Sequence, residues 1–319
     1  MRGVCGETPI HLANPQAPHP SPILSSPLSP LPSPLSLKKM SEKPAYLIFD
    51  LESVVDGRLV QKCRFPDQPG MTPEEAVAKE RERLLTTSNG KSDFVPHTFH
   101  VPVSIAIVKV GADYGFQELK TLDRPKFRPQ VIVKQFWKGW QSYGMPTLVT
   151  FNGRFFDMPV LELAAYRYGM AVPAWFNAPG NQYAQPRNRF NTNAHLDLQD
   201  FMGNQGATPI NGGLNLCAKL IGAPGKMDTK GDLVQELWER GEHERIDNYC
   251  MCDALDTYLV FLRTRVLTGQ LSINDERQLV ARLKGWLDTQ AGHNLALAEY
   301  RHRLIDWTAP GEDGNPFLD

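Results

Sequence analysis

The chain has 319 residues, of which 41% are hydrophobic and 22% are charged, as in an ordinary globular protein. Its formal net charge of −1 excludes a global basic field that would attract nucleic acid, so a polyanionic substrate would have to be held by local patches and by metal ions. No run of 18 apolar residues occurs, which argues against a membrane-spanning helix.

The five cysteines are odd in number and form no Cys-x-x-Cys pair, which predicts free thiols and a cytoplasmic location. Residues 8–36 are dense in proline and serine and lack the continuous apolar stretch of a secretory signal. Because proline removes backbone donors and fixes φ, we expect residues 1–39 to be a disordered tail, or a mis-assigned start ahead of Met40.

Regular elements are expected from Tyr46 onward. Apolar and β-branched runs predict strands at 46–53, 100–110 and 146–151, with a hairpin partner for the second at 116–122. A capping box that begins at Thr72 predicts a helix to about Leu85. Further helices are expected at 129–142, 158–168, 214–221, 231–240, 243–268 and 273–286, with a weaker one to residue 303, and residues 171–193 are expected to form a long loop.

Strands, some of them antiparallel, dominate the first half of this pattern, and helices dominate the second. No clean linker separates the two halves. This order predicts an α/β fold with a mixed β-sheet flanked by helices. We assign residues 40–268 to this domain and residues 269–319 to a helical C-terminal extension.

The first predicted strand ends on two carboxylates, Asp50 and Glu52, in the stretch YLIFDLES. Side chains alternate along a strand, so these two point to the same side and repel each other unless a cation lies between them. A metal ion would satisfy both. The alternative is a strand that ends in a polar turn.

A second carboxylate, Asp157, follows the predicted strand that ends near Asn152 and directly precedes a predicted helix. It is suited to cap that helix by accepting backbone N–H groups. Its place beyond a strand end also suits a ligand site, because such sites in α/β sheets gather there. Asp197, in the stretch HLDL, lies at another strand-like end and is expected to be structural.

The third acidic position lies in the stretch RIDNYCMCDALD. Tyr249 and Asp253 are four residues apart and share one face of a predicted helix. Asp247 and Asp256 compete with Asp253 for any role, but their spacing does not place them beside Tyr249. An ordinary helix face is the alternative interpretation of the pair.

Taken together, these carboxylates could hold two hard cations about 4 Å apart, a pair that activates water and stabilises the leaving oxygen of a phosphodiester. The stretches FDLES, TFNGRFFD and YCMCD, in this order, resemble the three motifs of the DEDD superfamily of 3′–5′ exonucleases, in the variant with Tyr-x-x-x-Asp as its third motif. The chain is most similar to the exonucleases related to the proofreading domain of family B DNA polymerases. The resemblance covers about Ala45 to Arg263 and implies a ribonuclease H-like fold.

The resemblance also implies roles for individual residues and two divalent ions, Mg²⁺ or Mn²⁺. Asp50, Glu52 and Asp253 would ligate one ion, and Asp50 with Asp157 would hold the second. Tyr249 would position the attacking water, and Asn152 would lie near the substrate strand. The implied reaction is hydrolysis at the 3′ end of single-stranded or frayed DNA, with release of nucleoside monophosphates.

Further positions are candidates for contact with the nucleic acid. Phe156 could stack on a base, whereas one of the adjacent pair Phe155 and Phe156 is expected to be in the core. Arg187 and Arg189, like Lys226 and Lys230, lie in predicted loops and could contact phosphates or be solvated loop charges.

Two alternatives remain at this point: a ribonuclease-type exonuclease that acts on RNA, and a catalytically silent nucleic-acid-binding module. All four acidic positions are filled, which favours catalysis. DNA is favoured over RNA as the substrate, no membrane association is expected, and repair or replication proteins are candidate partners.

Overall fold

A computed structural model describes residues 43–226 and 233–309. The chain divides into two units, Met1–Ser41 and Glu42–Asp319, and the described residues belong to the second. The expected proline-rich tail and Lys230 lie outside the described residues. The assignments of residues 40–268 and 269–319 to a domain and an extension stay predictions.

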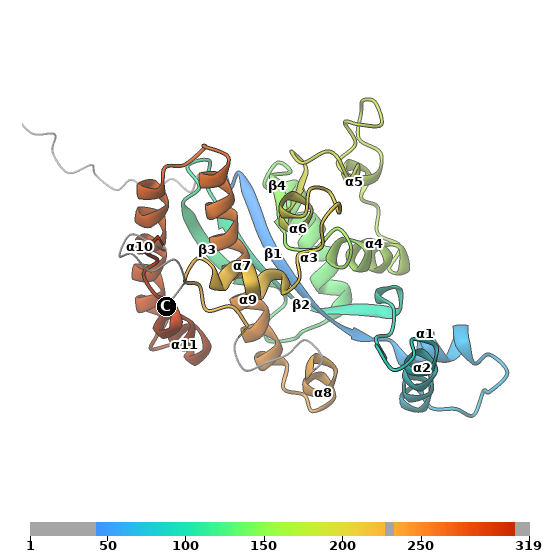
Figure 1. The fold of residues 1–319 in the computed structure, drawn as a ribbon. Coiled ribbons are helices and arrows are strands. Elements are labelled where there is room, and N and C mark those ends of the chain that lie inside the picture. Colours follow the sequence, from blue (N-terminus) through green and yellow to red (C-terminus); the bar gives the residue numbers. More distant parts are fainter. Residues whose placement is uncertain (1–42, 227–232, 310–319) are drawn as a thin grey trace, which may run out of the picture. The chain divides into compact units, whose positions relative to one another are not determined.

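A five-stranded mixed sheet is at the centre of the second unit (Figure 1). Its strands, in the order β3-β2-β1-β4-β5, are β1 (Tyr46–Val55), β2 (His100–Val110), β3 (Phe116–Thr121), β4 (Thr147–Thr150) and β5 (His195–Asp197). The pairs β1–β2 and β2–β3 are antiparallel, and the pairs β1–β4 and β4–β5 are parallel. The expected α/β fold with a mixed sheet flanked by helices is therefore confirmed.

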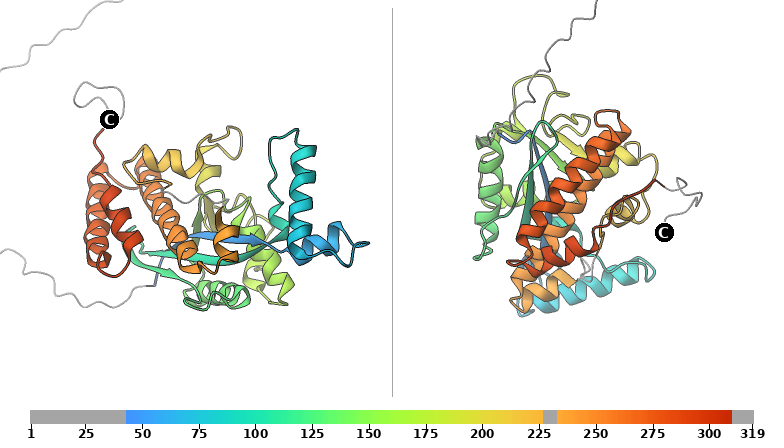
Figure 2. Two further views of the ribbon diagram at one scale, coloured as in Figure 1. Left: turned by 90° about the horizontal axis from the view of Figure 1, so that it is seen from below. Right: turned by 90° about the vertical axis from the view of Figure 1, so that its left-hand side faces the viewer.

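The two faces of the sheet are covered by different helices, as Figure 2 shows with the sheet seen from its side. On one face, α3 (Pro129–Ser142) and α4 (Asp157–Arg167) pack against Leu47, Phe49 and Leu51 of β1. On the other face lie α7 (Gly213–Lys219), α9 (His243–Leu267), α10 (Ile273–Gln290) and α11 (Leu295–Arg303), with Ile48 of β1 in the same cluster. The alternation of side chains along β1 thus fills both cores.

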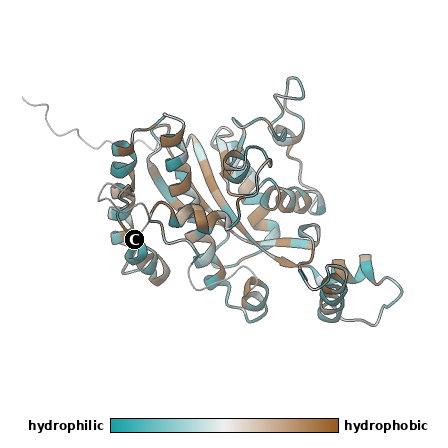
Figure 3. Cartoon of the chain, in the orientation of Figure 1, coloured by the Kyte–Doolittle hydropathy of each residue, from teal (hydrophilic) through white to brown (hydrophobic). Residues whose placement is uncertain are grey.

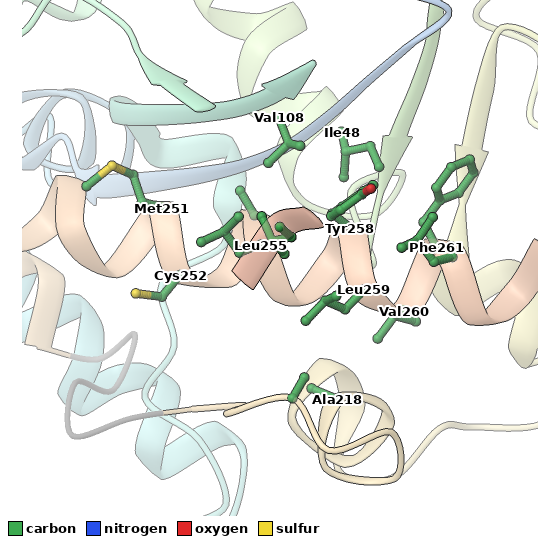
Figure 4. Close-up of a cluster of buried hydrophobic side chains, with 14 of the residues drawn as sticks. Ile48, Val108, Ala218, Met251, Cys252, Leu255, Tyr258, Leu259, Val260 and Phe261 are labelled. Atoms are coloured by element: carbon green, nitrogen blue, oxygen red, sulfur yellow. The ribbon is translucent and has the colours of Figure 1, made fainter. Parts of the chain in front are cut away.

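Helix α9 is buried on two sides (Figure 4). Met251, Leu255 and Tyr258 face the strand residues Ile48 and Val108, whereas Leu259 and Val260 point away from the sheet. A helix that is apolar around most of its circumference must lie inside a protein. The helices α10 and α11 share this core, because their apolar residues join the same cluster as those of α9.

The remaining described helices are short or peripheral: α1 (Gly57–Arg64), α2 (Pro73–Thr87), η1 (His97–Phe99), α5 (Pro173–Phe176), α6 (Leu198–Met202) and α8 (Val234–Glu239). The capping box at Thr72 is confirmed, because its hydroxyl accepts from the Glu75 N–H and the Glu75 carboxylate accepts from the Thr72 N–H. The helices α1, α5 and α6 were not predicted.

Hydrophobic residues colour much of the central strands brown in Figure 3. Within residues 43–226 and 233–309, no helix combines the length and the apolar character that a bilayer crossing requires.

Candidate metal centre

The sheet strand β1 presents Asp50 and Glu52 on the face covered by α9. Both carboxylates follow Ile48 in the two-residue period of the strand, so they continue the side that packs against α9. The register between β1 and β2 shifts directly after Glu52, between Glu52 and Ser53. Such a bulge bends the strand and re-aims side chains, and bulges are common beside active sites.

Helix α9 places Asp253 opposite these two residues. One carboxylate oxygen from each of Asp50, Glu52 and Asp253 lies within 4.8 Å of the other two. The Tyr249 hydroxyl, one helical turn earlier, is close enough to Asp253 for hydrogen bonding to offset part of the rise that burial causes in the pKa of that carboxyl. The structure thus brings together residues that are about two hundred positions apart in the sequence, and within the described residues this is the group of three carboxylates with metal-binding spacing.

Asp157 stands at the edge of this group. It is the first residue of α4 and is only 6% exposed. Phe156, not Asp157, is the capping position of the helix, and no side-chain cap bond is formed, so the helix-cap interpretation of Asp157 is wrong. Its carboxylate is close enough to Asp50 and Glu52 to add, after burial, to the raised pKa of both.

The four carboxylates repel one another. Burial, followed by the charges of Asp253 and Asp157, raises the pKa of Asp50 well above its usual range. Burial also raises the pKa of Asp157 to about 8 and that of Asp253 to about 6. Because burial and like charges both disfavour ionisation, this pocket attracts a cation.

A lysine partly offsets this charge. The Lys226 side chain is near enough to lower the pKa of Glu52 and of Asp253. Lys226 follows Gly225, and its backbone N–H is held by the Asn215 side chain at 2.9 Å. Sequence reasoning placed Lys226 in a loop with general phosphate contacts and missed its position beside the acidic group, since no local pattern links residues 52 and 226.

A divalent ion fits this donor set. Asp50 Oδ2 is buried and has no hydrogen-bond partner within the described part of the chain, so it is an acceptor in need of a donor or a cation. Hard cations such as Mg²⁺ prefer carboxylate oxygens from several segments.

Asp197 fixes the loop that precedes Asp157. Its carboxylate accepts the backbone N–H groups of Asn152 at 2.9 Å and Arg154 at 2.8 Å, and it also caps α6. Asp197 therefore holds the loop between β4 and α4, which leads to Asp157. This bears out its expected structural role.

The loop itself is tight. Asn152 has a φ of 64°, a left-handed conformation that asparagine tolerates better than most residues. A Cβ added to Gly153 would lie 2.5 Å from the side chain of Thr150, so only glycine fits there. The Asn152 side chain accepts a hydrogen bond from Gln199 Nε2 at 3.0 Å, which shows it in a loop-forming contact.

Much of the amino-acid sequence matches a known protein family. Residues 92–304, about two thirds of the chain, match a family described as predicted 3′–5′ exonucleases related to the exonuclease domain of family B DNA polymerases. The chain belongs to this family. The family implies that this exonuclease is a hydrolase that depends on divalent metal ions.

This exonuclease spans less than half the length of the following proteins, to which it is similar. A DNA polymerase of Archaeoglobus fulgidus is 26% identical over 130 residues, which is 40% of this chain and 16% of the polymerase. The family B DNA polymerase of Pyrobaculum calidifontis aligns with a TM-score of 0.43 and 13% identity over 69% of this chain and 24% of that chain. A zinc-bound complex of E. coli ExoI with ssDNA aligns with a TM-score of 0.33 and 15% identity over 77% and 43% of the two chains.

The other acidic residues on α9 of the exonuclease have partners of their own. Asp247 accepts a hydrogen bond from the Ser104 hydroxyl, and Asp256 accepts one from the Tyr300 hydroxyl at 2.8 Å. Neither belongs to the group formed by Asp50, Glu52 and Asp253. The spacing of the carboxylates thus favours Asp253 over Asp247 and Asp256, and its role as a ligand stays a prediction.

An aromatic cluster lies beside the start of α4. Phe156 packs partly against the α3–α4 core and contacts the rings of Phe94, His97 and His100. Phe155 is 66% exposed and contacts only the edge of His97 among the described rings. One ring of the pair is therefore packed and the other is free at the surface, as expected, but the packed one is Phe156.

The two loop arginines have protein contacts. Arg187 forms an ion pair with Glu162 at 2.8 Å and lies over the Phe176 ring, and Arg189 lies over the Phe190 ring. Arg187 would have to exchange Glu162 for a phosphate in order to bind substrate. Substrate contact by Arg187 and Arg189 stays a prediction.

Proposed function

We propose that the chain is a metal-dependent exonuclease that hydrolyses single-stranded or frayed DNA from the 3′ end and releases nucleoside monophosphates. The proposal includes a two-metal mechanism with Mg²⁺ or Mn²⁺. It also includes action in the cytoplasm, with repair or replication proteins as candidate partners.

One observation carries the proposal. Three distant segments bring four acidic side chains together, and one buried oxygen among them, Asp50 Oδ2, has no hydrogen-bond partner within the described residues. A protein that used these residues only for stability would leave the repulsion among them unbalanced. A cation-binding site explains both the convergence and the unpaired oxygen.

The four carboxylates would hold two ions between them. Asp50, Glu52 and Asp253 would hold one ion, and Asp50 with Asp157 would hold the second. Bound divalent ions supply charge neutralisation for the phosphodiester and lower the pKa of bound water. Asp50 would help to hold both ions, since its buried Oδ2 has no hydrogen-bond partner among the described residues.

Tyr249 is suited to orient the attacking water. Burial and the neighbouring carboxylates raise its pKa far above the usual range, so the phenol keeps its proton at neutral pH. Its hydroxyl therefore remains a hydrogen-bond donor and acceptor close to Asp253. Lys226 is suited to face the scissile phosphate, since its charge already acts on Glu52 and Asp253.

The burial of the carboxylates favours a substrate whose 3′ end is single-stranded or frayed. Asp157 and Asp253 are 6% and 9% exposed, so a base-paired terminus has to open before its last phosphate can reach them. The exposed Phe155 ring, two residues before Asp157, is suited to stack on a base, and the partly packed Phe156 ring completes the platform. Stacking tolerates any base because every base has a π-face, so cleavage is expected to be independent of sequence.

The test uses DNA and RNA strands of the same sequence, each labelled at the 5′ end, with Mg²⁺, with Mn²⁺ and with EDTA. We expect shortening from the 3′ end in the presence of metal and faster hydrolysis of DNA. Asp50→Asn should abolish shortening, and Asp256→Asn is the matched control because it is a buried carboxylate outside the group. Unchanged activity of Asp50→Asn would reject the metal assignment, and preferential shortening of RNA would reject the substrate assignment.

A further inference from the structure

A second charged feature lies on the sheet face opposite the carboxylates. A cleft of about 650 Å³ opens between strands β2 and β3 and helix α3. We call it the lysine cleft. Leu47 and Ile107 are at its base, and they belong to the core on the α3 side of the sheet. The lysine cleft is therefore separate from the metal centre, which faces α9.

Five basic side chains line the cleft, against one acidic side chain. They are Lys109, Lys120, Arg124, Lys134 and Lys138, and the acidic residue is Asp123. The Asp123 carboxylate is already bound by the Arg128 guanidinium through two hydrogen bonds, at 2.7 and 2.9 Å. On a chain whose formal net charge is −1, this is a marked local excess of positive charge.

Three of these lysines lack a partner among the described residues. Lys109 is paired with Glu118 at 2.7 Å, and Arg124 is paired with Glu244 at 3.4 Å. Lys120, Lys134 and Lys138 are exposed and form no ion pair or side-chain hydrogen bond with any residue that the structure describes.

The positions of Lys134 and Lys138 work against the stability of α3. They are four residues apart, so they are neighbours on one face of the helix, and like charges at this spacing destabilise a helix. Neither packs into the core nor balances an acid among the described residues, so the fold itself does not explain them. They are suited to a ligand that brings several negative charges.

One end of the cleft is two strands away from Asp50, although the cleft and the metal centre are on opposite faces of the sheet. Thr121, at one end of the cleft, pairs with Ala106, and Ala106 pairs with Asp50. Two strand spacings separate Thr121 from Asp50, a distance of about 10 Å. The Arg124–Glu244 ion pair joins the same end of the cleft to the first turn of α9, the helix that carries Asp253.

We propose that the lysine cleft binds the phosphate backbone of the polynucleotide upstream of the 3′ end that is being hydrolysed. This inference rests on the proposed function. The cleft would allow a chain of near-neutral net charge to bind a polyanion at one basic surface.

The chemistry of the cleft favours phosphates over an acidic protein segment. Leu47, Phe136 and Trp140 of the cleft are buried, whereas Tyr143 is partly exposed, so an incoming ligand meets several ammonium groups around one accessible aromatic ring. Lysines act as mobile point charges that suit a flexible phosphate chain. Protein interfaces instead rely on accessible aromatic and aliphatic anchors.

The test compares two double variants. Lys134→Gln with Lys138→Gln removes two cleft charges, and Lys62→Gln with Lys91→Gln removes two exposed lysines near α1 and α2 that form no ion pair with a described residue. Binding of a fluorescent single-stranded 30-mer is measured in EDTA as a function of salt, with hydrolysis of a dinucleotide as a second readout.

We expect the cleft variant to lower the slope of log affinity against log salt by about 1.4, because each phosphate contact contributes about 0.7 for single strands. At about 0.1 M salt its affinity should fall on the order of tenfold. Dinucleotide hydrolysis should be unchanged, because so short a substrate does not reach the cleft. The control variant should match the unaltered protein in both readouts.

An unchanged salt slope in the cleft variant would overturn the proposal, and so would lysine-dependent binding of polyglutamate without lysine-dependent binding of the 30-mer. An equal loss of dinucleotide hydrolysis would also overturn it, since the lysines would then act at the metal centre. If the unaltered protein fails to shorten the 30-mer from its 3′ end in Mg²⁺, the proposed function fails. The binding measurement still decides the role of the cleft, because it needs no catalysis.

Discussion

Replacement of Asp253 by asparagine should stabilise the metal-free protein while it abolishes activity. The amide would keep the shape of the side chain and could still accept the hydrogen bond from Tyr249, but it would remove one of the buried, mutually repelling charges. Any change in stability therefore reports the repulsion among the buried carboxylates, because the packing of the side chain stays the same.

The raised pKa of Asp253 determines how much unfolding free energy the variant should gain. In the folded protein this pKa is raised from 3.8 to about 6, so the folded state binds a proton that the unfolded chain has released. Stability from this group is complete below about pH 4 and is lost as the pH rises through about 6. A shift of roughly two units corresponds to about 3 kcal/mol, so the variant should exceed the unaltered protein by up to that amount at about pH 8 and by almost nothing at about pH 4.

The assay is chemical unfolding by urea at both pH values, in EDTA and in excess Mg²⁺. A metal ion that binds only the folded state adds about 2.7 kcal/mol at a hundred times its dissociation constant. We expect the unaltered protein to gain this stabilisation and the asparagine variant to lose most of it. Asp67→Asn, at an exposed site, is the control and should change neither measurement.

Two results would contradict this account. Equal unfolding free energies of the variant and the unaltered protein at about pH 8 in EDTA would show that Asp253 carries no repulsive cost. An unchanged response of the variant to Mg²⁺ would show that Asp253 does not hold the ion.

Three further predictions concern single residues. Tyr249→Phe should lower kcat on a 3′ end by about 10²-fold or more with little change in KM, because the hydroxyl positions the water, and an unchanged kcat would contradict this. Asp197→Ala should lower the unfolding free energy by about 2–4 kcal/mol, since it leaves the N–H groups of Asn152 and Arg154 unpaired, and thermal melting measures this loss. Asp256→Asn should stabilise the protein above about pH 7, because burial raises the pKa of this carboxyl to about 7 while asparagine carries no charge; a flat difference between pH 4 and 8 would refute it.

The parts of the site that follow a local repeat could be predicted from the sequence. The two-residue period of a strand puts Asp50 and Glu52 on one side, and the helical period puts Tyr249 beside Asp253. Both expectations agree with the structure, and the long helix α9 was also predicted nearly to its ends.

Features that depend on long-range contacts could not be predicted. The ion pair between Arg187 and Glu162 and the approach of Lys226 to Glu52 join segments with no common pattern. The strand β5 has only three residues, too few to show a period, so the role of Asp197 rested on its position alone. The helix α1 was missed because it follows a strand with only Asp56 as a signal of its start.

The burial of α9 on two sides has a consequence for how the enzyme matures. The proposed ligands at positions 50, 157 and 253 lie roughly a hundred residues apart, and the last of them is carried by a helix that shares its core with α10 and α11. A chain emerging from the ribosome therefore has a complete sheet before it has a complete set of ligands. Nascent protein of this kind would be inert toward nucleic acid until α11 has been synthesised.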